Sequence, residues 1–199
     1  MNDDVHRHED LGTVEREGDL LRITFVRALP SDAAGVWRAL TESAGLRHWF
    51  PADILGEREP GAALTFRFWP EHVEAGREQL EAAGEDGEED MPGVLRVWEP
   101  ARVLEFDWDT ERLRFELEDL ARPAGTVRNG EAGPHACTRL TFSTWLAIEG
   151  PWPPEGTMAG WYACLHALGT YLRTGTGEDV STEEAGALTA EYARIIAKL

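Results

Sequence analysis

Residues 160–172 read GWYACLHALGTYL and form the longest apolar helical pattern in a chain of 199 residues. The pattern predicts a helix from about Thr157 to Arg173. At 100° per residue, one broad apolar face collects Trp161, Cys164, Leu165, Leu168, Tyr171 and Leu172. Gly175 and Gly177 follow, and glycine at this place is typical of a helix end. A helix with such a face requires an apolar surface to lie on.

The middle of the chain predicts that surface as an antiparallel sheet. In RLRFELE (112–118), Leu113, Phe115 and Leu117 alternate with charged side chains, which indicates one buried and one solvated face. Other strand-like segments are 14–29, ALTFRFW (63–69), GVLRVWEP (93–100), RVLEFDWD (102–109) and CTRLTFSTWLA (137–147). Short connections between several of them favour an antiparallel meander. The strands, two small helices and one long helix therefore predict an α+β domain.

Two short helices are predicted in VWRALTESAGLRHWFP (36–51), with Ser31 able to cap the first. Pro51 disfavours the helical conformation at Phe50 and ends the second helix. Trp49 and Phe50 then either fill the core or seal an opening to a ligand. A final helix is predicted to start at Ser181, because Glu184 three residues later completes a capping box.

The economical arrangement lays the long helix across the apolar face of a curved sheet. One helix alone does not fill a strongly bent sheet, so we expect a space between the two. Large aromatic side chains suit the wall of such a cavity. The candidates for this wall are Trp49, Phe66, Phe68, Phe106, Trp108, Phe115, Phe142, Trp161 and Leu165. Ordinary core packing is the alternative for each of them.

Four motifs in this order resemble one protein family: VWRALTESAGLRHWFP, GVLRVWEPARVLEFDWD, TRLTFSTWL and GWYACLHALGTYL. They look like the activator of Hsp90 ATPase homologue (AHSA1-like) branch of the START/Bet v 1-like SRPBCC superfamily, over about residues 14–173. The resemblance implies a helix-grip fold, in which a curved antiparallel sheet wraps around a long C-terminal helix and leaves an apolar cavity. It implies no assigned reaction. Nothing in this chain matches the chaperone-binding domain of eukaryotic Hsp90 activators, so we do not expect a co-chaperone.

The domain boundaries follow from the resemblance and from composition. Residues 1–12 are expected to be a loose tail, 13–175 the helix-grip domain, and 176–199 an appended helix. An acidic insertion near 70–91 and a loop rich in glycine and proline at 121–136 depart from the family pattern. Both could remodel an opening to the cavity. The start of the chain lacks the apolar segment of a signal peptide, so we expect the protein in the cytoplasm.

Charge and motif content narrow the function classes. The formal net charge of −18 would repel nucleic acids and anionic membranes, and no segment predicts membrane insertion. Cys137 and Cys164 lack the sequence spacing of metal ligands, and His6 and His8 lie in the loose tail, so we expect no metal site. No known catalytic or cofactor-binding motif occurs, so we expect no cofactor. An inward Arg67, Arg96 or Arg139 could hold a ligand carboxylate, but only if it were paired.

The first hypothesis is therefore a binding protein that encloses a small apolar or aromatic ligand, without a defined reaction. The first alternative is an enzyme that resembles polyketide cyclases and aromatases and uses the same cavity. The second is a protein-interaction or stress-response module that docks through the final helix or the acidic insertion, with a homodimer as one form. A buried carboxylate or histidine that faces an open cavity would favour the enzyme, and a wall of hydrocarbon alone would not.

Overall fold

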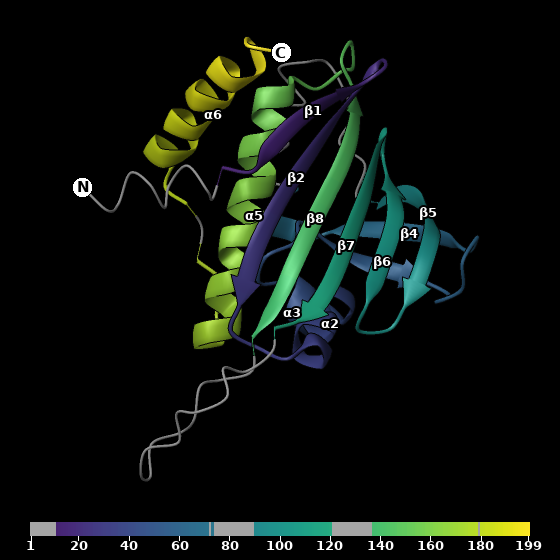
Figure 1. Cartoon of the computed structure of the whole chain (residues 1–199). Coiled ribbons are helices and arrows are strands. Elements are labelled where there is room, and N and C mark those ends of the chain that lie inside the picture. Colours follow the sequence, from purple (N-terminus) through teal and green to yellow (C-terminus); the bar gives the residue numbers. More distant parts are fainter. Residues whose placement is uncertain (1–10, 72, 74–89, 121–136, 179) are drawn as a thin grey trace, which may run out of the picture.

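A computed structural model describes residues 11–71, 73, 90–120, 137–178 and 180–199 (Figure 1). The strands in this part are β1 (Thr13–Glu17), β2 (Leu20–Leu29), β3 (Ala52–Gly56), β4 (Ala63–Phe68), β5 (Asp90–Glu99), β6 (Val103–Trp108), β7 (Glu111–Asp119) and β8 (Thr138–Ala147). The helices are α2 (Ala33–Thr41), α3 (Ser43–Leu46), α5 (Pro154–Thr174) and α6 (Thr182–Ile196). None of these helices is long and apolar enough to cross a membrane.

The strands form one antiparallel sheet in the order β1-β2-β8-β7-β6-β5-β4-β3. Strands β2 and β8 pair along their whole length, from Leu20 opposite Ala147 to Leu29 opposite Thr138. A break of register in β5 between Leu95 and Val97 adds to the bend of the sheet. The predicted antiparallel sheet is confirmed. Residues 14–29, expected as one strand, are a β1–β2 hairpin, and β3 was not predicted.

The long helix α5 lies across the concave face of this sheet, which is the predicted helix-grip fold (Figure 1). It begins at Pro154, three residues before the predicted start, because proline is well tolerated in the first turn of a helix. It ends at Gly175, whose φ of 85° is the left-handed conformation that glycine adopts without strain. Met158, Trp161, Leu165 and Leu168 are the large apolar side chains that α5 buries.

The final helix α6 packs against α5. Its start is as predicted, since the Ser181 hydroxyl accepts a hydrogen bond from the backbone N–H of Glu184 at 3.2 Å. Tyr192 is fully buried, and Leu188, Ile195 and Ile196 are half-buried against the core. The apolar side of α6 therefore covers α5 in the same chain.

Two short helices form as predicted, but their bounds differ from the prediction: the break lies at Glu42, and the second helix ends at Leu46, before Phe50 and Pro51. Gly45 sits so close to α2 that a Cβ there would meet the Cα of Ala39 at 2.7 Å, so a larger residue would push the helices apart. The N-cap of α2 is Asp32, not Ser31: its Oδ1 accepts a hydrogen bond from the backbone N–H of Gly35 at 2.7 Å. The Trp49 indole N–H donates to the Ala39 carbonyl at 2.9 Å and is buried with it.

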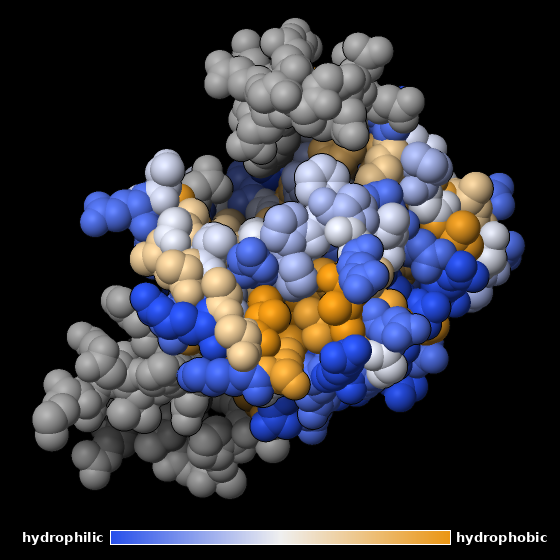
Figure 2. Space-filling view, turned by 90° about the horizontal axis from the view of Figure 1, so that it is seen from above, coloured by the Kyte–Doolittle hydropathy of each residue, from blue (hydrophilic) through white to orange (hydrophobic). Residues whose placement is uncertain are grey.

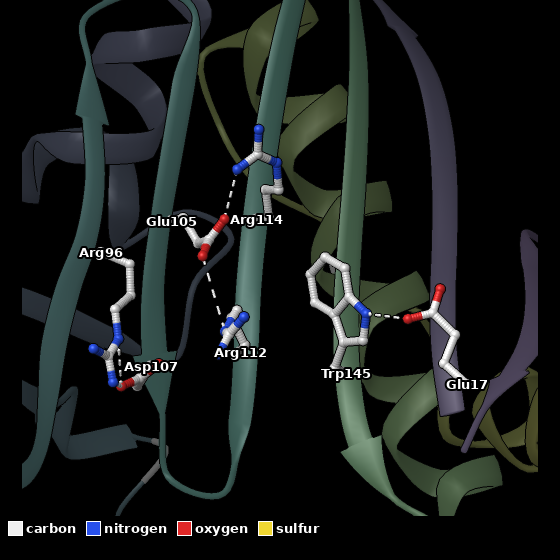
Figure 3. Close-up of polar contacts among 7 residues, drawn as sticks. All are labelled: Glu17, Arg96, Glu105, Asp107, Arg112, Arg114 and Trp145. Atoms are coloured by element: carbon white, nitrogen blue, oxygen red, sulfur yellow. Dashed lines mark hydrogen bonds and ion pairs between the residues drawn. The ribbon is translucent and has the colours of Figure 1, made fainter. Parts of the chain in front are cut away.

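The convex face of the sheet carries charged pairs between neighbouring strands (Figure 3). Glu105 on β6 lies between Arg112 and Arg114 on β7, at 3.9 Å and 2.6 Å. The alternative of an inward arginine is wrong: Arg67, Arg96 and Arg139 are exposed and pair with Asp90, Asp107 and Glu118, respectively. The strand alternation places all three on the face that water can reach, so none of them enters the space under α5.

Candidate functional site

A hollow of about 370 Å³ opens between the N-terminal half of α5 and the end of the β6–β7 hairpin. Its lining residues are Pro51, Trp108, Glu111, Trp152, Pro153, Gly156, Thr157, Gly160, Trp161 and Cys164. Its walls are mainly apolar, and it is open to solvent on one side. Seen from above in Figure 2, hydrophobic residues gather on one part of the surface and hydrophilic residues surround them; most residues that line the hollow are tryptophan, proline, glycine or threonine, which this scale does not colour as hydrophobic. The volume suits a small organic molecule.

A tight turn sets two of the lining residues side by side. Trp108 ends β6, Glu111 begins β7, and the two are direct partners across the hairpin. Only Asp109 and Thr110 connect them, and Asp109 adopts a φ of 49°, which aspartate tolerates better than most residues. The Asp109 carboxylate then accepts a hydrogen bond from the indole N–H of Trp152 at 3.2 Å. The turn thus places a carboxylate and two indole rings at one end of the hollow.

The Glu111 carboxylate is half-buried and held by neutral donors. One of its oxygens, Oε2, accepts a hydrogen bond from the Thr144 hydroxyl at 2.7 Å and another from the Trp161 indole N–H at 3.1 Å. Burial raises the pKa of this carboxyl above its usual range, and the nearby charge of Asp109 raises it further. The two hydrogen bonds lower the pKa but do not cancel the effect of burial. Three elements, β7, β8 and α5, therefore fix one acidic group at the edge of an apolar space.

Packed aromatic rings lie behind Trp108 and Trp161, which line the hollow. Phe50 stacks on Trp161 with ring centroids 6.1 Å apart and meets the edge of Trp108 at 4.9 Å. Phe142 contacts Trp161 from the sheet side at 5.2 Å. Trp161 is only 6% exposed, whereas Trp152 at the mouth is 51% exposed. The wall is therefore buried on its inner side and exposed at the mouth.

The predicted wall residues divide between this hollow and the core. Trp108 and Trp161 line the hollow. The remaining candidates that the core buries are Trp49, Phe66, Phe106, Phe115, Phe142 and Leu165. Phe68 is half-buried, and its ring lies 5.7 Å from that of Trp108. Most of the aromatic side chains thus fill the space between sheet and helix, and the space that stays open lies at one end of α5.

Trp49 and Phe50 illustrate this filling. Both rings are buried, and Phe50 backs the inner wall of the hollow. Trp49 also borders a second hollow of about 390 Å³ on the other side of Pro51, with Arg47, His48 and Glu71 among its lining residues. Pro51 and Cys164 line both hollows.

Sequence reasoning missed Glu111 and Thr144, although a signal for each was present. Glu111 lies two residues before Leu113 and four before Phe115, so the strand period puts its side chain on the apolar face. Thr144 follows Phe142 at the same spacing and is fully buried. A carboxylate on the buried face of a strand is unusual unless it is paired, which makes it a candidate for function.

Two helical glycines were also missed. Gly156 and Gly160 line the hollow, and a Cβ built at either position meets no atom within 4 Å. Close packing therefore does not explain them, although glycine in a helix costs about 1 kcal/mol relative to alanine. Their effect is to leave the surface of α5 bare where it faces the hollow.

The histidines that the structure describes do not line this hollow. His48 stacks on Tyr171 with ring centroids 4.5 Å apart, and His166 is exposed. His6 and His8 lie outside the described residues, as do most of the acidic insertion and the loop at 121–136. Neither cysteine forms a disulfide. Within the parts of the chain that the structure describes, no group of three or more histidine, cysteine, aspartate or glutamate side chains could hold a metal ion.

Solved structures share this architecture at low sequence identity. A conserved protein of unknown function from Enterococcus faecalis, EF2215, is 19% identical with a TM-score of 0.67, covering 98% of this chain and 99% of its own. CalU16 from Micromonospora echinospora is 15% identical with a TM-score of 0.59, covering 94% and 97%. The Aha1 dimer from Colwellia psychrerythraea is 19% identical with a TM-score of 0.51, covering 78% and 98%.

No protein-family model matches the sequence, and no curated protein matches it. The structural likeness is therefore a likeness of fold, which the sheet order and the position of α5 support independently. On these observations the chain has the helix-grip fold of the START/Bet v 1-like proteins.

Proposed function

We propose that this protein binds a small, largely apolar or aromatic molecule in the hollow between α5 and the β6–β7 hairpin. The observation that carries the proposal is a space of about 370 Å³, lined by Trp108, Trp152 and Trp161, that no side chain of the described residues fills. Removal of apolar surface from water would drive binding, at about 25 cal/mol for each Å². The half-buried Glu111 would orient the ligand.

Native mass spectrometry of the freshly purified chain is the first test. We expect an excess mass that disappears on denaturation. A defined probe, naphthylmethanol, then tests the site by isothermal titration calorimetry. It is neutral and flat, and its ring matches the aromatic walls. We expect binding with one molecule per chain.

A pair of matched variants locates this binding. Gly160→Leu puts an aliphatic side chain into the hollow, whereas Gly186→Leu makes the same change in α6, where a Cβ also meets no atom within 4 Å. We expect the Gly160 variant to lose the probe and the Gly186 variant to keep it. If both variants bind the probe equally well, the hollow is not the binding site.

Glu111 favours a second candidate, an enzyme similar to polyketide cyclases. Its raised pKa and its position at the wall suit a group that exchanges a proton with a bound, folded chain. A poly-β-ketone thioester mimic is the substrate to test, with cyclised product measured by mass spectrometry. This candidate requires that Glu111→Gln abolish turnover and still bind the probe. An unchanged rate in that variant would exclude the role.

The finer family assignment also belongs here. We infer from the four sequence motifs that the chain lies in the AHSA1-like branch, that residues 13–175 form its helix-grip domain with 176–199 appended, and that it works in the cytoplasm. The Aha1 structure from Colwellia psychrerythraea is a dimer. A homodimer of this chain is a matching proposal, and sedimentation of the purified protein tests it.

A further inference from the structure

The carboxylate in the hollow has an acceptor that the protein leaves open. Thr144 and Trp161, both neutral donors, bond to the Oε2 oxygen of Glu111. Among the described residues, none donates a hydrogen bond to its Oε1 oxygen, and none forms an ion pair with Glu111. Burial of a carboxylate without a cation is costly, so a positive charge from outside the chain would stabilise this group.

The rest of the hollow also suits a cation. Trp108, Trp152 and Trp161 surround the space, and the faces of indole rings attract positive charge. Asp109 adds a second carboxylate next to Glu111, in the turn that holds Trp152. Cys164 is the remaining titratable group in the lining, and no arginine, lysine or histidine lines this hollow in the described parts of the chain.

We propose that the ligand of the hollow is an organic cation: an apolar or aromatic molecule that carries a protonated amine, which pairs with the Oε1 oxygen of Glu111. This inference rests on the proposed function and narrows its ligand class. An anionic ligand would meet two carboxylates and a chain with a net charge of −18. A neutral ligand would fill the hollow but leave the carboxylate without a counter-ion.

Three probes with the same ring and different charge test the inference on the wild-type chain. They are naphthylmethylamine, which is cationic at neutral pH, naphthylmethanol, which is neutral, and naphthylacetate, which is anionic. We expect calorimetry to show the amine binding about tenfold more tightly than the alcohol, because a charge-assisted hydrogen bond of this kind is worth at least that factor. The acetate should bind most weakly.

Two variants separate a local effect from the charge of the whole protein. Glu111→Gln and Glu118→Gln remove the same charge from the same strand, but Glu118 is exposed on the convex face and pairs with Arg139. We expect Glu111→Gln to bind amine and alcohol equally and Glu118→Gln to keep the preference for the amine. A preference that survives Glu111→Gln would overturn the inference.

The wild-type comparison does not depend on how the variants fold. If the alcohol binds as tightly as the amine, the inference fails while the proposed function stands. If none of the three probes binds to the wild type, both proposals fail. If each probe binds to Gly160→Leu as tightly as to the wild type, the hollow is not the site and both proposals fail as well. These outcomes are distinct in one set of titrations.

Discussion

Replacing Gly160 by alanine should stabilise the protein and weaken its ligand binding at the same time. Gly160 lies inside α5, and a Cβ there meets no atom within 4 Å, so the methyl group causes no clash. Alanine is favoured over glycine in a helix by about 0.8–1.0 kcal/mol. For a chain of this size that gain raises the midpoint of thermal unfolding by roughly 2–4 °C. The methyl group also narrows the hollow that Gly160 lines.

Gly186→Ala is the matched control, because Gly186 is also helical and also has open space around its Cβ position. Differential scanning calorimetry should show a similar rise for both variants. Titration with naphthylmethanol should show weaker binding, on the order of tenfold, for the Gly160 variant alone, since one methyl group in an apolar pocket is worth about that factor. A lower unfolding midpoint for Gly160→Ala would show that its surroundings are not open. Equal binding by both variants would show that the bare helix surface does not shape the site.

Three further changes test other parts of the structure. Because the folded protein raises the pKa of Glu111, the wild type should lose stability relative to Glu111→Gln as pH rises from about 4.3, the unfolded pKa, through the folded value. Urea midpoints measured from pH 4 to 8 check this, and a wild type that gains stability relative to the variant as pH rises would contradict it. Trp49→Phe leaves the buried Ala39 carbonyl without its donor and should cost about 1–3 kcal/mol in urea unfolding, whereas a cost near zero would mean that water replaces the indole. Asp32→Ala removes the cap of α2 at Gly35 and should cost about 1 kcal/mol, while Asp32→Asn should restore most of it.

The fold was readable from the sequence because its signals are periodic. The alternation in β7 and the broad apolar face of α5 each specify which side of the element is buried, and two apolar faces can satisfy each other in few ways. The predictions of secondary structure were wrong where a segment is too short to show a periodic pattern. The β1–β2 turn contains only Gly18 and Asp19, which is too short to interrupt the strand pattern visibly. Strand β3 has five residues, too few for its alternation to stand out.

The site was predicted less well, because an aromatic residue on the inner face gives no sign of whether a neighbour fills the space beside it. Phe66 and Trp108 have the same sequence signature, yet Phe66 is fully buried and Trp108 borders the hollow. The difference depends on where α5 begins relative to the hairpin, which is a tertiary property. Glu111 is different in kind: its strand position was sufficient to place it inward, and only its partners Thr144 and Trp161 required the structure.

Three features of the hollow that the fold itself does not require occur together. A half-buried carboxylate lacks a cationic partner among the described residues, a helix carries glycine where alanine would fit, and the exposed Trp152 ring stands at the mouth. The two hydrogen bonds to Glu111 offset only part of the cost of its burial, and no packing contact explains the glycine. Natural sequences break local rules of this kind mainly where function requires it. A bound amine would neutralise Glu111, occupy the space above Gly160 and cover Trp152. The same ligand should therefore raise the unfolding temperature of the wild type more than that of Glu111→Gln.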